Sequence, residues 1–306
     1  MNPLSMLRNS VYMPYARIPP GQIVELPGRG TTYVTDTAGP DPDSPTIVLL
    51  HALGCTGLLT WFPAIEGLSK RFRVITLDQR CHGQGIHTEH FSLVDCADDV
   101  AALLDVLEID SAVIAGYSMG SIVAQRMWRQ HPSRVQGLVL AATTDRFRRS
   151  MVEMLFFAAM EGSMLATRGA ARSRIASWAA KTAAEATDFE PSDIQEWALR
   201  EFRSTSAWGV GQALSALGRH HSRPWLRRID VPTAVVVLNN DHVIPPARQR
   251  ELARAIPGAT IHDIDAGHAS CVLESEVFVP AFLEAAATVN ARRRDFADRV
   301  ESSDSA

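Results

Sequence analysis

Cysteine is scarce in this 306-residue chain, and both a long hydrophobic run and a large excess of charge of one sign are absent. The four cysteines, Cys55, Cys81, Cys96 and Cys271, form no Cys-x-x-Cys pair and no dense framework. We therefore expect reduced thiols rather than disulfides, as in a cytosolic protein. The same spacing offers no zinc motif, so the sequence predicts neither a bound metal ion nor a cofactor.

The charge balance argues against nucleic acid as a partner. The chain has 30 Lys and Arg residues against 34 Asp and Glu residues, a formal net charge of -4, and no basic run interleaved with aromatic side chains. No stretch approaches the roughly twenty apolar residues of a membrane span. The segment before Gly21 also lacks the apolar core of a secretion signal. We expect a cytoplasmic protein without integral membrane association, and the oligomeric state stays open.

What the chain does contain is a serine between two glycines, in Gly116-Tyr117-Ser118-Met119-Gly120. The β-branched apolar run before it is typical of a buried strand, and apolar residues recur at helical spacing after it. Gly-x-Ser-x-Gly at such a strand-to-helix junction makes a sharp turn that lifts the serine hydroxyl out of the fold. Ser118 is therefore a candidate nucleophile; the alternative is that it only caps the helix, because serine favours that position.

Buried strands alternate with amphipathic helices along most of the chain. This alternation predicts an α/β protein with a mostly parallel, doubly wound sheet of eight strands, covered by helices on both faces. The expected strands are residues 22–25, 31–37, 46–50, 73–77, 112–115, 135–141, 233–238 and 260–264. The expected helices are residues 60–70, 93–107, a helix following Ser118, 246–255 and 271–289.

The alternation breaks between residues 146 and 228, where alanine, methionine, arginine and tryptophan recur with helical periodicity. We expect residues 22–145 and 229–290 to form one core, and residues 146–228 to form an inserted helical cap. Residues 1–21 are expected to be an N-terminal extension. Residues 291–306 are charged, then serine-rich and acidic, and are expected to be a disordered tail.

A serine nucleophile needs a base within hydrogen-bond reach and a carboxylate that orients that base. His268 lies between the last expected strand and the last helix, and Asp241 follows the carboxyl end of the preceding strand, where ligands collect in α/β sheets. The predicted order is therefore Ser118, Asp241, His268. Asp145, just after the strand that ends at Ala141, is an alternative for the acid.

This order, together with the serine motif, resembles the α/β-hydrolase fold superfamily, and the resemblance covers residues 22–289. Two further pieces carry it. His51-Ala52-Leu53-Gly54 looks like the family's His-Gly-x-Gly loop, and residues 78–85 are similar to its Asp-x-Arg-Gly-His-Gly loop. The resemblance implies a capped serine hydrolase of esterase or lipase type.

The family resemblance also implies an oxyanion hole, in which backbone N–H groups bind the negative oxygen of the reaction intermediate. By that resemblance the donors are Met119, which follows the nucleophile, and Leu53. Ala52 stands where the family usually has glycine, and alanine resists a positive φ, so the path of this loop and the Leu53 donor depend on how the chain turns there.

Several other side chains compete for a role in the chemistry. We expect His51, His82 and Asp78 to brace loops, and His242 to point away from Asp241. His262 and Asp263 are expected at the surface. Cys55 lies close to the expected pocket as a possible second nucleophile, but no base adjoins it in the sequence.

The expected reaction is acyl transfer on a small or apolar carboxylic ester, followed by hydrolysis of the acyl-enzyme. The alternatives are hydrolysis of a carbon–carbon bond, a cofactor-free perhydrolase or haloperoxidase activity, and, in another class, a ligand receptor.

The predicted cap also contains three arginines near its start, Arg146, Arg148 and Arg149. We expect them to form a solvated face rather than an anion site. About two thirds of its apolar side chains are expected to bury against the core and the rest to line the pocket; they are Met151, Met154, Leu155, Phe156, Phe157, Met160 and Met164.

Overall fold

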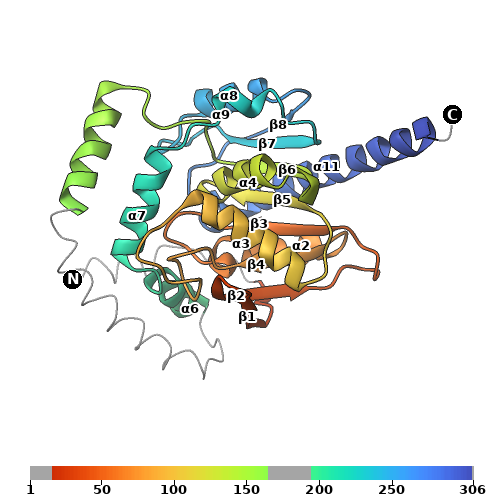
Figure 1. Cartoon of the computed structure of the whole chain (residues 1–306), viewed down its shortest axis with the longest axis horizontal. Coiled ribbons are helices and arrows are strands. Elements are labelled where there is room, and N and C mark those ends of the chain that lie inside the picture. Colours follow the sequence, from red (N-terminus) through yellow and green to blue (C-terminus); the bar gives the residue numbers. More distant parts are fainter. Residues whose placement is uncertain (1–15, 165–193, 305–306) are drawn as a thin grey trace.

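The computed structural model describes residues 16–164 and 194–304, so most of the expected N-terminal extension lies outside the described residues. Its centre is an eight-stranded sheet with the order β1-β2-β4-β3-β5-β6-β7-β8 (Figure 1). The β2 strand is antiparallel to both β1 and β4, and every other neighbouring pair is parallel. The strands are β1 (Gly21–Leu26), β2 (Gly30–Thr37), β3 (Thr46–Leu50), β4 (Arg73–Leu77), β5 (Ala112–Tyr117), β6 (Val135–Ala141), β7 (Thr233–Leu238) and β8 (Thr260–Ile264). The predicted fold class is therefore confirmed.

The inner strands form where β-branched and aliphatic residues follow one another, because both faces of these strands are covered. In β3, Val48 and Leu50 face one layer of helices, and Ile47 and Leu49 face the other. The β5 strand is buried along its whole length and continues to Tyr117, two residues beyond the predicted end. That extension brings the end of the strand directly to Ser118.

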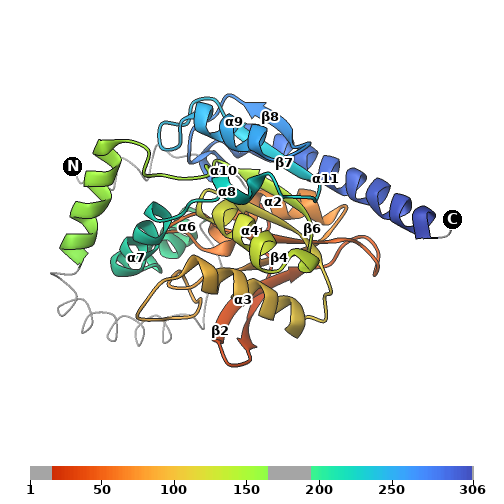
Figure 2. The same cartoon turned by 45° about the horizontal axis from the view of Figure 1, so that its top comes forward.

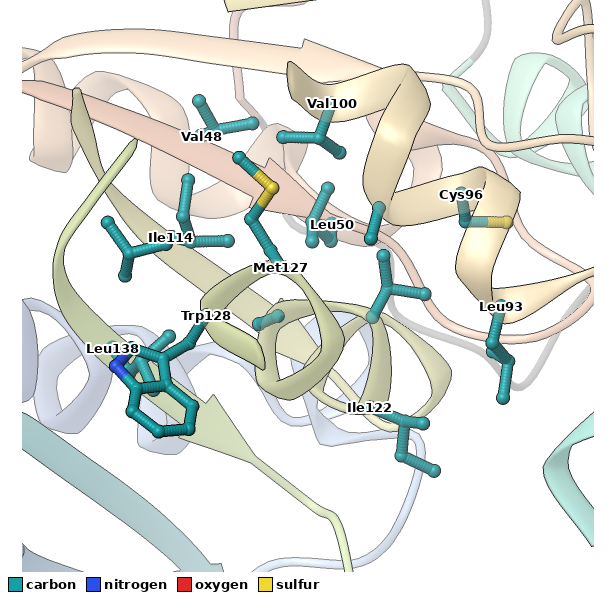
Figure 3. Packing of buried hydrophobic residues seen from close by; sticks show 14 of the residues in the cluster. Val48, Leu50, Leu93, Cys96, Val100, Ile114, Ile122, Met127, Trp128 and Leu138 are labelled. Carbon is teal, nitrogen blue, oxygen red and sulfur yellow. The ribbon is translucent and has the colours of Figure 1, made fainter. Parts of the chain in front are cut away.

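One face of the sheet packs against α3 (Leu93–Val106), α4 (Met119–Gln130) and α9 (Pro246–Ala255). Figure 3 shows this packing, with side chains of α3 and α4 lying over strand residues such as Ile114 and Leu138. Ser92 begins α3 by accepting a hydrogen bond from the Asp95 N–H, as an N-cap does.

The opposite face packs against α2 (Gly57–Ser69) and α11 (Ser275–Asp304). Along the chain, the short α10 (Ser270–Leu273) follows β8 and precedes α11. An aromatic cluster joins the two long helices, and the ring centroids of Trp61 and Phe282 are 4.7 Å apart. The α2 helix begins at Gly57, three residues before the predicted start, and Thr56 caps it because its hydroxyl accepts the Leu59 N–H. Both helices are thus fixed to the sheet by buried aromatic rings.

Among the described residues between β6 and β7, the regular elements are helices, and Arg146 and His221 form an isolated antiparallel bridge. The helices are one over residues 151–164, then α6 (Ile194–Arg203), α7 (Ala207–Gly218) and α8 (Arg223–Leu226). Helix 151–164 lies beside α7, since the Phe157 ring occupies the space next to Gly218. Figures 1 and 2 place this helix pair at one end of the molecule and the C-terminal turns of α11 at the other.

The expectation that most apolar side chains of helix 151–164 bury against the core is wrong. Of the seven named above, only Phe157 is buried, at 4% exposure, and Met160 and Met164 are half-buried. Met151, Met154, Leu155 and Phe156 are exposed. The physical reason is that this helix packs on α7 through one narrow face, and no described element covers its other faces.

The expectation of a disordered tail over residues 291–306 is also wrong for most of its length. The α11 helix continues without a break to Asp304. Arginine and alanine are frequent in the first part of this stretch, and both are strong helix formers, so the charged segment extends a helix that is already nucleated by packing upstream.

Candidate active site

Ser118 stands at the junction of β5 and α4 with a strained backbone, φ 52° and ψ −110°. The glycines on either side are required by close approach. A Cβ atom on Gly116 would lie 2.2 Å from the Gly120 carbonyl carbon, and one on Gly120 would lie 2.0 Å from the Leu50 carbonyl oxygen. Only hydrogen atoms fit at both positions, so the sharp turn follows from these two residues.

The Ser118 hydroxyl does not cap α4, because its side chain makes no capping hydrogen bond. Its Oγ lies 3.1 Å from Nε2 of His268 instead. The alternative interpretation of Ser118 as a helix cap is therefore wrong. The side chain turns away from the helix toward a base that comes 150 residues later in the chain.

His268 lies between Ser118 and Asp241, with Nδ1 2.7 Å from Oδ2 of the carboxylate. Because a carboxylate only accepts hydrogen bonds, Nδ1 is the donor and Nε2 is left to accept the proton of the serine hydroxyl. The other carboxylate oxygen, Oδ1, accepts the backbone N–H groups of Val243 and Ile244, each at 2.8 Å. The structure thus brings together the three residues that the sequence predicted.

The backbone of His268 is held by the residue before the serine. The Tyr117 hydroxyl donates to the His268 carbonyl at 2.8 Å and lies 3.2 Å from the Ser270 hydroxyl. Burial raises the pKa of Tyr117 well above its usual range, so this hydroxyl stays protonated and remains a donor. The serine turn and the histidine loop are therefore tied by one side chain.

The alternative acid, Asp145, lies in a different environment. It is buried and forms ion pairs with Arg149 and, at 3.8 Å, with Arg223. Arg148 likewise pairs with Glu161 at 2.7 Å. The structure therefore gives His268 a carboxylate partner in Asp241, and it engages two of the arginines after β6 in ion pairs.

The loop after β3 is fixed by His51, which is fully buried. Its Nδ1 donates to the Ala52 carbonyl at 2.8 Å, and its Nε2 accepts the Gln79 N–H at 2.8 Å. Burial lowers the pKa of His51 well below its usual range, which keeps the ring neutral and able to make both bonds. His51 is thus a brace between two loops, as predicted.

The loop after β3 turns at Gly54 rather than at Ala52. The positive φ in this loop is at Gly54, φ +75°, and Ala52 has an ordinary negative φ. Alanine at this position is therefore compatible with the loop path. Leu53 is half-buried beside it, and Met119 is fully buried at the first position of α4.

The remaining polar residues near these loops have structural partners. Asp78 accepts the N–H groups of Gly57 and Gln84, and burial raises its pKa to about 7. His82 donates Nδ1–H to the Arg80 carbonyl, and burial lowers its pKa to about 4. Both are loop braces, as predicted.

Other competing side chains are unsuited to the chemistry. Burial raises the pKa of the Cys55 thiol to about 11, so it is protonated at neutral pH and a poor nucleophile. His242 is exposed, and Asp263 pairs with Arg250 at the surface. Within residues 16–164 and 194–304, no group of three His, Cys, Asp or Glu side chains could hold a metal ion.

Gln249 in α9 was not predicted from the sequence as part of this site. Its side-chain amide lies 3.0 Å from Oδ2 of Asp241. The available signal was a polar residue three positions before Leu252 and so on the apolar side of the helix, where an unpaired amide would be costly.

In the part of the chain that the structure describes, no helix is both long and apolar enough to span a bilayer.

The chain as a whole is similar to known proteins. A family model described as "alpha/beta hydrolase fold" matches residues 45–275. The 3-oxoadipate enol-lactonase 1 of Acinetobacter baylyi is 26% identical over 254 residues, which cover 83% of this chain and 92% of that protein. The magnesium-chelatase 30 kDa subunit of Rhodobacter capsulatus is 31% identical, over 77% of this chain and 84% of that one. The solved enol-lactonase from Burkholderia xenovorans superposes with a TM-score of 0.68 at 26% identity, covering 87% of this chain and all of the other (100%).

Proposed function

Because the chain belongs to the alpha/beta hydrolase fold family, we propose that it is a serine hydrolase that cleaves a carboxylic ester through an acyl-enzyme on Ser118. The observation that carries this proposal is the line of contacts from Ser118 Oγ to His268 Nε2 and from His268 Nδ1 to Asp241. A hydroxyl, an imidazole in the accepting tautomer and a buried carboxylate are what nucleophilic catalysis by serine needs.

The reaction proceeds in two halves. In the first, Ser118 Oγ forms a bond to the ester carbonyl carbon while His268 Nε2 takes its proton, and His268 then returns that proton to the leaving alcohol as the ester C–O bond breaks. In the second, water attacks the acyl-enzyme, His268 takes a proton from the water, and the acid is released with the serine hydroxyl restored. Asp241 stabilises the imidazolium that forms in each half.

We assign the oxyanion hole to the backbone N–H groups of Met119 and Leu53. Met119 is the first residue of α4, and the first N–H groups of a helix have no partner within it and point toward a developing anion. Leu53 belongs to the loop that His51 braces and that turns at Gly54. A rigid loop supports this role, because preorganised donors stabilise charge without rearranging during the reaction.

The substrate is a small or apolar ester, and the segment between β6 and β7 acts as a cap over the site. Two close approaches support the cap. Gly54, in the loop after β3, lies close to the Val210 side chain of α7, and Gly209 of α7 lies close to the Cys81 carbonyl in the loop after β4. The α7 helix therefore packs on both loops. Because two similar proteins are enol-lactonases, a cyclic ester is the first substrate class to test.

The test is labelling with a fluorophosphonate, followed by mapping of the adduct and profiling of esters, lactones, thioesters and amides of graded length. Ser118→Ala is expected to abolish labelling and to lower kcat by about 10⁴–10⁶-fold with the fold intact. Ser121→Ala is the matched control: this serine lies one turn along α4, its hydroxyl bonds to the Gly116 carbonyl, and its variant should still label.

Two outcomes would contradict the proposal. Failure of the folded wild-type protein to label at Ser118 would remove the acyl-enzyme, and undiminished ester turnover in Ser118→Ala would remove the nucleophile. Turnover of a dienone acid with no ester activity would instead identify carbon–carbon bond hydrolysis on the same three residues.

A further inference from the structure

We propose that Gln249 is a positioning residue that holds the Asp241 carboxylate in line with His268. The proposal rests on the function proposed above, in which Asp241 orients the histidine base. The hydrogen bonds of Gln249 go to Asp241, Ile244 and Leu238 and not to the serine or the imidazole, so it would act on catalysis through Asp241.

Gln249 lies on the inner side of α9, and it is fully buried. Its Nε2 lies 3.0 Å from Asp241 Oδ2 and 2.7 Å from the Ile244 carbonyl, and its Oε1 accepts the Leu238 N–H at 3.1 Å. One side chain therefore contacts the end of β7, the acid and the loop that follows the acid.

These partners fix which way the amide points. Leu238 supplies a backbone N–H, so the atom facing it must be the oxygen, and the Ile244 carbonyl accepts, so the atom facing it must be the nitrogen. The two hydrogens of Nε2 are then both used, one on Ile244 and one on Asp241. Reversing the amide would set oxygen against two acceptors, so Gln249 can only donate to the acid.

Gln249 donates to the same carboxylate oxygen that accepts the hydrogen bond from His268. Oδ2 of Asp241 receives both the Gln249 amide and His268 Nδ1, whereas Oδ1 is held by the backbone N–H groups of Val243 and Ile244. The Asp241 side chain is fully buried, at 0% exposure. Because solvent does not reach it, the amide fixes the position of Oδ2 and withdraws part of its negative charge.

The test is Gln249→Met, which keeps the length of the side chain and removes both hydrogen-bonding groups. We expect kcat to fall about tenfold with KM unchanged, because Oδ2 is no longer held in line with the imidazole. We also expect the acid limb of the kcat/KM profile to move to higher pH. The cause is the fuller negative charge left on Oδ2, which favours the imidazolium.

Gln125→Met is the matched control. Gln125 is equally buried, lies on a helix of the same layer, and bonds to the Ser222 hydroxyl rather than to the acid. Its variant should lose stability without moving the pH profile. A Gln249→Met enzyme with wild-type kcat and an unmoved acid limb, or one whose losses match those of Gln125→Met, would overturn the proposal.

A second variant keeps the inference testable if Gln249→Met folds poorly. Gln249→Glu is nearly isosteric but places a second carboxyl oxygen about 3.0 Å from Oδ2. Its activity relative to wild type should fall as pH rises and the pair of carboxyl groups loses its shared proton. A constant ratio across the pH range would count against the inference. Failure of the proposed function itself is recognised separately, because it would leave the wild-type protein without Ser118-dependent turnover.

Discussion

The sheet core and the helices inserted between β6 and β7 are built in opposite ways. In the core, the polar atoms around Ser118 are buried and bonded; the Asp241 carboxylate alone contacts four donors. On helix 151–164, by contrast, large apolar side chains such as Val152 and Leu155 are 77% and 62% exposed. The difference teaches that the proposed chemistry depends on polar atoms held by several partners each, whereas the proposed cap exposes apolar side chains on a helix with few fixed contacts.

The two regions are joined by a few polar contacts. Glu153 at the start of helix 151–164 pairs with Arg248 of α9, and the Thr56 hydroxyl donates to Glu201 of α6. Both contacts reach elements that border the site, α9 beside Asp241 and α2 after the loop of Leu53. Substitutions on either side of these contacts can therefore test how far the two regions are separate.

The largest effect should come from Asp241→Asn in the core. Four groups now donate hydrogen bonds to the Asp241 carboxylate, and the NH₂ group of asparagine would face at least one of them. His268 would also lose the acceptor that fixes its tautomer. We expect kcat to fall about 10³–10⁴-fold, with the far-ultraviolet circular dichroism spectrum unchanged. Steady-state kinetics on any ester that the wild type hydrolyses checks it.

Asp145→Asn is the control for this prediction. It should lower the free energy of unfolding, because Arg149 loses a buried partner, while most activity remains. If the two variants exchanged these properties, the acid would be Asp145, and the contact between His268 and Asp241 would be incidental.

A second comparison makes the same glycine-to-alanine substitution in the sheet core and in helix 151–164. A Cβ atom on Gly116 would meet backbone at 2.2 Å, whereas one on Gly162 in helix 151–164 would meet nothing within 4 Å. Gly116→Ala should cost about 3 kcal/mol or more and lower activity sharply. Gly162→Ala should stabilise by about 0.5–1 kcal/mol through helix propensity, with activity unchanged. Urea unfolding measures both changes in stability, and equal effects would show that the sharp turn at Ser118 is not tightly constrained.

Much of this molecule was predictable because buried strands carry a strong local signal. Five strands have the predicted bounds, and Ser118 and His268 were found from a motif and from their place between elements. The misses share one cause. Whether Phe156 is buried, and which partner Gln249 donates to, depends on which elements meet in space, and neither helix periodicity nor residue type contains that information.

The contact between α6 and the core predicts a pH dependence of stability. Burial raises the pKa of Asp78 to about 7, and burial also raises the pKa of Glu201, whose negative charge further raises the pKa of Asp78. A carboxyl group with a raised pKa gives stability that is complete below its unfolded pKa, near 4, and is lost as pH rises through its folded pKa. The wild-type protein should therefore lose stability between about pH 4 and pH 7.

Glu201→Gln should reduce that loss. The amide oxygen still accepts the Thr56 hydroxyl, but the charge that acts on Asp78 is gone, so the pKa of Asp78 falls. We expect the free energy of unfolding to rise by about 1 kcal/mol near pH 8 and to change little near pH 4. Glu196→Gln, at an exposed site on the same helix, is the control. Parallel stability profiles for wild type and Glu201→Gln would contradict the prediction.

The smallest effect should come from the exposed face of helix 151–164. Val152→Ser and Phe156→Ser replace side chains that are 77% and 55% exposed, so each should change the free energy of unfolding by less than about 0.5 kcal/mol. If this face selects substrates, KM for long acyl esters should rise while KM for acetyl esters and kcat stay constant. A fall in kcat for both ester classes would mean that the insertion acts on the machinery itself, and the separation between the two regions would fail.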